Sequence, residues 1–131
     1  MKQLTKAEEQ IMQILWHLKE GIVKQVVDGF DEPRPAYTTV ATVLKVLEKK
    51  GFVDHKTIGN THLFYPSVSK KEYAKYQFGS LLKDYFNGSF PKMATFFARE
   101  NNLTLKELEE MMKITESELS GNKNNENGNN I

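Results

Sequence analysis

The segment from Tyr37 to Lys50 constrains the fold of this 131-residue chain more than any other part of the sequence. Two prolines, Pro33 and Pro35, precede it, and proline interrupts a helix because it lacks the backbone N–H and restricts the preceding residue. A glycine follows it, suited to the left-handed conformation that ends many helices. At helical periodicity one face is apolar, with Val40, Val43, Leu44 and Leu47. The opposite face carries Thr38, Thr42, Lys45 and Lys49, with Ala41 at its flank. The segment therefore predicts an amphipathic helix with one packing face and one outward face.

Two helical segments precede this helix, and a hairpin follows it. Thr5 and Glu8 have the spacing of a capping box, and an apolar helical stripe runs from there to Gly21. A second, shorter stripe covers residues 22–30. Two stretches rich in β-branched and aromatic residues follow, at residues 52–58 and 62–65. They flank a turn at Gly59-Asn60-Thr61. The expected fold class is mainly α, a winged helix-turn-helix of three helices and a β-hairpin wing, followed by a C-terminal helical segment.

The C-terminal half has the pattern of three short helices, which begin at the capping residues Ser69, Ser89 and Thr104. Eight of the 14 aromatic residues lie between positions 73 and 97. Three short helices cannot bury so much apolar surface alone, so we expect them to pack against a second copy of the chain. The candidates for this dimer contact are Tyr73, Tyr76, Leu81, Tyr85, Phe86, Phe96, Phe97, Leu105 and Leu108.

These patterns divide the chain into three expected parts. A winged-helix domain occupies residues 1–68, and a helical dimerisation segment occupies residues 69–115. Residues 116–131 are nearly free of apolar side chains and have six asparagines among the last ten positions. Such a composition cannot bury enough apolar surface to fold, so we expect a disordered tail.

Composition excludes several classes of function. The chain has no cysteine, which excludes disulfide scaffolds, thiolate metal sites and cysteine nucleophiles. No apolar run is long enough to span a membrane, and the N-terminus lacks the apolar core of a signal peptide, so we expect a cytoplasmic protein. The three histidines form no helical ligand pair, and no catalytic set or phosphate loop has a workable spacing. We therefore expect no enzyme activity, no metal site and no cofactor.

The outer face of the predicted third helix has the chemistry of a helix that reads DNA. Threonine offers a hydroxyl to base edges and a methyl to thymine, and lysine reaches guanine or phosphate. The whole chain carries a net charge of +1, but residues 36–66 hold four lysines against two acidic residues, an excess of +2. The alternative is a surface helix with an ordinary polar face. The candidates for base contact are Thr38, Ala41, Thr42 and Lys45, and those for phosphate contact are Lys49, Lys50 and Lys56.

Six blocks of sequence carry a family resemblance between residues 4 and 114. They are Leu4-Thr5-Lys6-Ala7-Glu8, Ile14-Leu15-Trp16, Tyr37-Thr38-Thr39-Val40-Ala41-Thr42-Val43-Leu44, Leu47-Glu48-Lys49-Lys50-Gly51-Phe52-Val53, Phe64-Tyr65-Pro66 and Leu103-Thr104-Leu105-Lys106-Glu107-Leu108. On these blocks the chain resembles the penicillinase-repressor family of bacterial winged-helix regulators, which includes β-lactamase and methicillin-resistance repressors and copper-responsive relatives.

The resemblance implies a homodimeric transcriptional repressor whose winged helix binds a palindromic double-stranded operator, and it adds Thr39 to the candidates for DNA contact. It also implies control of β-lactam-resistance genes. Repressors of this family are released when a membrane sensor-transducer protease responds to a β-lactam and the repressor is cut. On this chain the cut would lie near Phe96-Phe97, where Phe96 stands in place of the family's asparagine. The copper-responsive relatives use C-terminal cysteines, which this chain lacks.

Two other functions are open at this point. One is a winged-helix regulator that is switched by a small ligand bound in the aromatic segment at residues 73–97. The other is a winged-helix module that binds a protein through its third helix.

Overall fold

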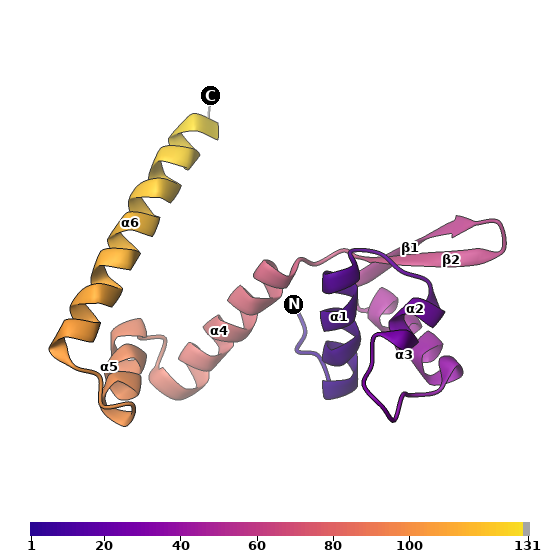
Figure 1. Cartoon of the computed structure of the whole chain (residues 1–131), viewed down its shortest axis with the longest axis horizontal. Helices are drawn as coiled ribbons and strands as arrows, with labels where there is room; N and C mark the ends of the chain where they lie inside the picture. Colours follow the sequence, from indigo (N-terminus) through magenta and orange to yellow (C-terminus); the bar gives the residue numbers. More distant parts are fainter. Residues whose placement is uncertain (130–131) are drawn as a thin grey trace. The chain divides into compact units, whose positions relative to one another are not determined.

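The computed structural model describes the backbone of residues 1–129 and the side chains of residues 1–121. Its elements are α1 (Lys6–Leu18), α2 (Val23–Asp28), α3 (Tyr37–Lys49), β1 (Val53–Ile58), β2 (Thr61–Pro66), α4 (Lys70–Phe86), α5 (Phe90–Glu100) and α6 (Leu105–Asn129) (Figure 1). Three helices followed by an antiparallel hairpin and then by further helices confirm the expected fold class. The chain divides into two compact units, Met1–Leu81 and a second that begins at Leu82.

Local hydrogen bonds explain where the helices begin and end. The backbone N–H of Thr5 donates to the Glu8 carboxylate at 2.8 Å, and the N–H of Glu8 donates to the Thr5 hydroxyl at 3.2 Å, which completes the predicted capping box. The hydroxyls of Ser69, Ser89 and Thr104 each accept from an N–H three residues on, so the three other predicted helix starts are confirmed. Gly51 follows α3 with φ of 83°, the left-handed conformation expected of it.

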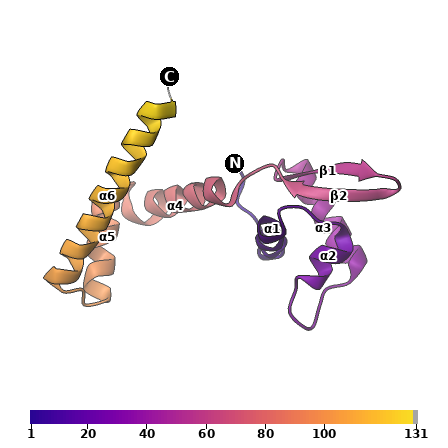
Figure 2. The same cartoon turned by 45° about the horizontal axis from the view of Figure 1, so that its top comes forward.

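The wing is a two-stranded antiparallel sheet that projects away from the helices of its unit (Figure 2). Its register pairs Val53 with Pro66 at the base and Ile58 with Thr61 at the tip. The turn contains Gly59 at φ of 62°, as a tight hairpin requires. At the base, the backbone of Gly21 exchanges two hydrogen bonds of 2.9 Å with Phe64. The wing is thereby joined to the segment between α1 and α2.

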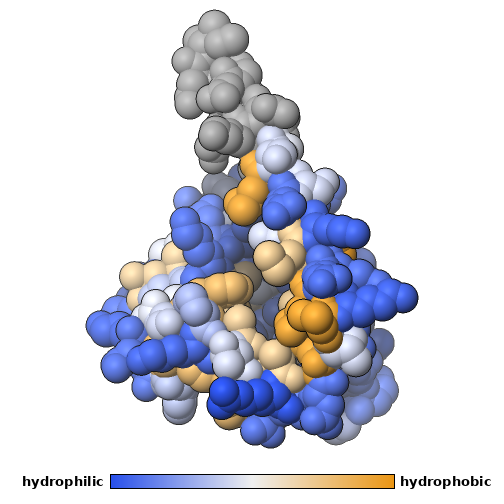
Figure 3. All heavy atoms as spheres, turned by 90° about the vertical axis from the view of Figure 1, so that its left-hand side faces the viewer, coloured by the Kyte–Doolittle hydropathy of each residue, from blue (hydrophilic) through white to orange (hydrophobic). Residues whose placement is uncertain are grey.

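The second unit exposes many apolar side chains. Within the part of the chain whose side chains are described, Met93 in α5 is its one buried hydrophobic residue. Figure 3 shows apolar side chains, in orange, gathered at the surface of this part of the chain. The large hydrophobic side chains exposed there include Tyr85, Phe90, Phe96, Phe97, Leu105, Met111, Met112 and Ile114. Such a surface is unusual for a monomer.

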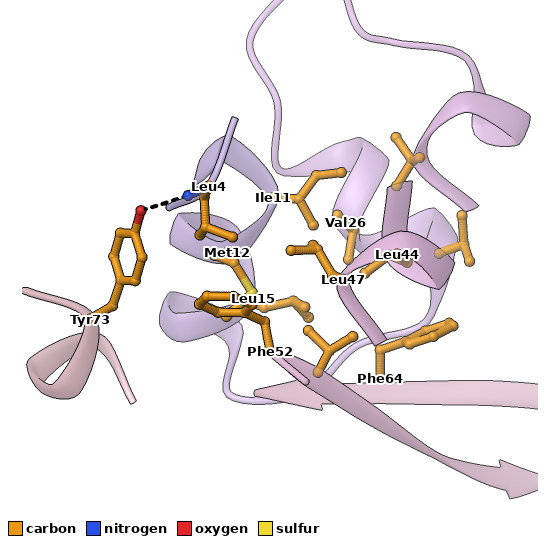
Figure 4. Close-up of a cluster of buried hydrophobic side chains, with 13 residues drawn as sticks. Leu4, Ile11, Met12, Leu15, Val26, Leu44, Leu47, Phe52, Phe64 and Tyr73 are labelled. Atoms are coloured by element: carbon orange, nitrogen blue, oxygen red, sulfur yellow. Dashed lines mark hydrogen bonds between the residues drawn. The ribbon is translucent and has the colours of Figure 1, made fainter. Parts of the chain in front are cut away.

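The core of the first unit lies between the three N-terminal helices and the base of the hairpin (Figure 4). Met12, Leu15, Val26, Leu44 and Leu47 are fully buried there. Tyr73, from the first turns of α4, also belongs to this core. Its hydroxyl accepts a hydrogen bond of 3.0 Å from the backbone N–H of Leu4, and its ring meets that of Phe52 edge-on with centroids 5.7 Å apart. The start of α4 is therefore part of the winged-helix unit.

The structure differs from the sequence-based division of the chain. The predicted boundary at residue 69 separates Tyr73 from the core in which it is buried, whereas the division of the chain into two units falls within α4, after Leu81. The predicted end of the first helix at Gly21 also differs, because Lys19 already adopts a left-handed φ of 73°. Gly21 instead forms the bridge to Phe64, and a Cβ there would come within 3.3 Å of the Leu18 side chain.

The expected disordered tail is also different in the structure. Helix α6 continues through residues 116–129, most of the segment predicted to be disordered; residues 130 and 131 lie outside the described residues. Helix propensity accounts for this extension as far as residue 119, because residues 105–119 contain no proline and are rich in Glu, Lys, Leu and Met, so the helix propagates beyond its cap at Thr104. None of the described helices is long and apolar enough to cross a membrane.

Candidate nucleic-acid interface

Helix α3 presents two chemically different faces. Its inner face is fixed by Val40, Leu44 and Leu47, whose exposed fractions are 1%, 0% and 0%. Because this face is packed against the core, the opposite face is held outward. The structure brings the following predicted contact residues together on α3 as exposed side chains: Thr38, Thr39, Thr42, Lys45 and Lys49. Ala41 is half-buried at the edge of this face.

Thr42 has its hydroxyl proton committed to the helix. Its Oγ1 donates a hydrogen bond of 2.9 Å to the backbone carbonyl of Thr38, one turn earlier. The hydroxyl oxygen keeps its capacity to accept, and the methyl group stays free. Thr42 can therefore accept a hydrogen bond from an amino group on a base edge, or pack against a thymine methyl.

The start of α3 adds a residue, Tyr37, to those predicted from the sequence for DNA contact. Tyr37 is the first residue of the helix and is 58% exposed. The N-cap residue Ala36 provides no side-chain hydrogen bond to the helix. The first N–H groups of α3 therefore have no side-chain cap from Ala36, and such groups at a helix start can donate hydrogen bonds to a phosphate oxygen. The sequence contains a signal for this role of Tyr37, because an apolar residue at the N-cap position, Ala36, is followed directly by an aromatic residue.

Lys50 occupies a different environment from the one predicted for it. Its ammonium group forms an ion pair with the buried Glu8 carboxylate in α1, at 2.7 Å. Burial by itself raises the pKa of Glu8, but hydrogen bonds from Lys50 and Thr5, together with the Lys50 charge, outweigh burial and hold it below the ordinary value of 4.5. Lys50 therefore joins α3 to α1, and the prediction of a free phosphate contact there does not fit the structure.

Lys56 lies on the wing. Its Nζ is 3.7 Å from a carboxylate oxygen of Glu20 and 5.6 Å from the centre of the Tyr65 ring. The side chain is 60% exposed, so the ion pair is weak and easily exchanged for another anion. Lys56 thus keeps the properties expected of a phosphate contact, and that role stays a prediction.

The residues predicted for dimerisation fall into two groups. Tyr73 is 4% exposed in the core of the first unit, and Tyr76 packs against that core half-buried, so neither is free for a partner as predicted. The others lie at or near the surface: Leu81, Tyr85, Phe96, Phe97 and Leu105 are exposed, and Phe86 and Leu108 are half-buried. The two groups differ because an aromatic stripe predicts that side chains are buried, but it does not predict whether their own unit or a second chain covers them.

Phe96 and Phe97, the residues at the predicted cleavage point, lie within α5. The two residues are 48% and 46% exposed, and their rings contact each other with centroids 5.6 Å apart. The Phe96 ring also contacts Phe86, again at 5.6 Å. Both residues have helical backbone, which a protease can cut only after local unfolding of α5.

Similarity to known proteins identifies the family of the chain. The family model described as penicillinase repressor matches residues 4–117, which is most of the chain and includes all of α3 and the wing. The chain belongs to the penicillinase repressor family. This confirms the resemblance found in the sequence, and it classes the chain with transcriptional repressors and not with enzymes.

Relatives with curated names are similar over nearly their whole length. The penicillinase repressor of Bacillus licheniformis is 24% identical over 115 residues, covering 87% of this chain and 90% of the relative. The methicillin resistance regulatory protein MecI of Mammaliicoccus sciuri is 23% identical over 113 residues, covering 86% and 92%. A solved structure of the CopR repressor is 26% identical and aligns with a TM-score of 0.43, covering 50% of this chain and 96% of that one.

Proposed function

We propose that this repressor acts as a homodimer that binds a palindromic DNA operator through α3. The observation that carries the proposal is the outward face of α3, where exposed threonines and lysines lie opposite a fully buried apolar face. Short hydroxyl side chains and lysines at such a position match the requirements of a helix in the major groove. We assign base contact to Thr39, Thr42 and Lys45, with Thr38 and Ala41 beside them, and phosphate contact to Tyr37, Lys49 and Lys56.

The surface of the second unit supports the homodimer. Tyr85 is 76% exposed and Leu105 is 73% exposed, and several more aromatic and aliphatic side chains of α5 and α6 accompany them. Residues 67–131 carry nine basic and nine acidic residues, so no net charge opposes self-association of this part. A twofold dimer places two α3 helices in major grooves separated by roughly 34–36 Å or a multiple of that distance.

Binding to single-base operator variants tests the role of α3. The operator is first selected from a randomised duplex library with the full-length chain, and affinities are then measured by fluorescence anisotropy at several salt concentrations. Lys49→Ala removes one proposed phosphate contact, so it should weaken binding to all sequences alike and reduce the salt slope by about one. Thr42→Ala should change the preferred base at one position of each half-site.

Lys50→Met is the matched control for these variants, because Lys50 lies close to α3 in sequence but pairs with Glu8. It should leave the salt slope unchanged under conditions where the variant is folded. A Thr42→Ala protein with unaltered base preference, or a Lys50→Met protein with the reduced slope of Lys49→Ala, would contradict the assigned interface.

We further propose that the repressor controls β-lactam-resistance genes and leaves its operator after cleavage near Phe96-Phe97 by a membrane sensor-transducer protease. Cutting there separates α6 from the rest of the exposed apolar surface and weakens the dimer. Two unlinked half-site binders lose the gain from high effective concentration, on the order of 10² to 10⁴-fold.

The intact mass of the repressor, followed in cells before and after β-lactam exposure, tests this release. Fragments that end near Phe96 are expected as target transcription rises. Full-length protein that persists during induction would instead support release by a small ligand.

A further inference from the structure

Three potential metal ligands meet where α3 joins the wing. Glu48 lies in the last turn of α3, and Asp54 and His55 lie at the start of β1. One ligand atom from each side chain can be chosen so that all three lie within 4.8 Å of one another. The Glu48 and His55 side chains are only 32% and 28% exposed, so these two members are partly shielded from water, whereas Asp54 is exposed. The group does not match a known metal-binding sequence motif, because its members come from two elements that the turn at Gly51 brings together.

The imidazole of His55 is held in place by contacts on several sides. Its Nδ1 contacts the Glu48 carboxylate, while the backbone N–H of His55 donates a 2.8 Å hydrogen bond to Asp54 Oδ1. The ring of His62, from β2, stacks on it with centroids 4.2 Å apart and planes 14° apart. Phe64 lies against the same ring at 5.6 Å. A ligand that is already oriented loses little conformational entropy when it binds an ion.

The charge of the group favours a cation. In the part of the chain that the structure describes, neither Glu48 nor Asp54 forms an ion pair with a lysine or arginine. Two carboxylates therefore lie close together. Among the three side chains of the group, only the imidazole of His55 can offset their negative charge. Like charges in such an arrangement repel each other, and a divalent ion between them replaces repulsion with attraction.

We propose that Glu48, Asp54 and His55 bind a divalent transition-metal ion of the zinc class. One imidazole nitrogen and two carboxylate oxygens, with water in the remaining position, suit Zn²⁺ and similar borderline ions. Mg²⁺ is a poorer match, since it prefers oxygen ligands alone. The bound ion joins the last turn of α3 to the first strand of the wing. It thereby fixes the wing relative to α3.

Isothermal titration of the metal-free, full-length chain with ZnCl₂ tests the site. The wild type should bind one ion per chain through this group, and MgCl₂ should give no comparable binding. His55→Ala and Glu48→Gln should each weaken the binding by at least about tenfold, since even the loss of an outer partner of a metal ligand costs 10- to 100-fold. His17→Ala is the matched control, because His17 is exposed in α1 and lies outside the group; its affinity should be unchanged.

The imidazole nitrogen shifts of the three histidines in NMR spectra supply a second readout that does not depend on any variant folding. Addition of Zn²⁺ should move the signals of His55 and leave those of His17 in place. No Zn²⁺ binding by the wild type, equal losses in the His17 and His55 variants, or shifts confined to His17 would each overturn the proposal. Because the test contains no DNA, its failure would leave the proposed operator binding untouched.

Discussion

At the scale of single residues, Gly29 ends α2 and lies against Ile14 of α1. A Cβ at this position would lie 2.6 Å from Cγ2 of Ile14, whose β-branched side chain has little freedom to move away. Gly29→Ala should therefore destabilise the chain by about 1–3 kcal/mol, the usual cost of overpacking. Urea unfolding measures the change.

Gly79→Ala is the control for this substitution. Gly79 lies inside α4 with open space around its Cα, so alanine there should raise stability by about 0.5–1 kcal/mol through helix propensity. Equal effects of the two substitutions would contradict the close contact between Gly29 and Ile14.

The pair of Glu8 and Lys50 makes stability depend on pH in a defined direction. The pKa of Glu8 is lowered in the folded chain, so the folded state binds its proton less readily than the unfolded state. The stabilisation is complete above about pH 4.5 and is lost as the pH falls from there through the lower folded pKa. Glu8→Gln should remove this part of the pH dependence, as measured by urea unfolding from about pH 7 to about pH 3. An unchanged pH slope in Glu8→Gln would show that other carboxylates cause the acid loss.

At the scale of elements, Tyr73 fastens α4 to the winged-helix unit. Its buried hydroxyl accepts the Leu4 N–H, and burial raises the pKa of this hydroxyl, so it stays protonated at neutral pH. Tyr73→Phe should cost about 0.5–1.5 kcal/mol and increase hydrogen exchange at the Leu4 amide. Tyr85→Phe, also in α4 but 76% exposed, should change neither quantity. A Leu4 amide that remains equally protected in Tyr73→Phe would contradict the anchoring role.

At the scale of the whole molecule, the two units predict separable folding and association. All residues of the main hydrophobic core lie between Leu4 and Tyr73, so a fragment ending at Leu81 contains that core in full. This fragment should fold and sediment as a monomer, whereas the full chain should sediment as a dimer. A shorter fragment ending at Val68 lacks Tyr73 and should be less stable than the longer one. A dimeric 1–81 fragment in analytical ultracentrifugation would place the association surface in the first unit.

Features that depend on neighbouring residues were predictable from the amino-acid sequence. The helix starts at Thr5, Ser89 and Thr104 were predictable because a cap needs only a side chain and an N–H three residues away. The two faces of α3 followed from helical periodicity, and Gly51 marked its end. Most of the candidate interface was therefore visible in the sequence, since one helix carries it.

Contacts between groups that are far apart in sequence depend on how the helices and the hairpin pack. Lys50 looked like a phosphate contact until α1 placed Glu8 against it, 42 positions away in sequence. Tyr73 looked like part of a dimer surface until its hydroxyl met Leu4, at a separation of 69 residues. Glu48 and His55 came together because Gly51 reverses the chain between them. Periodicity predicts that a side chain is buried or exposed, but the group it meets depends on how helices pack, and that information is spread over the whole chain.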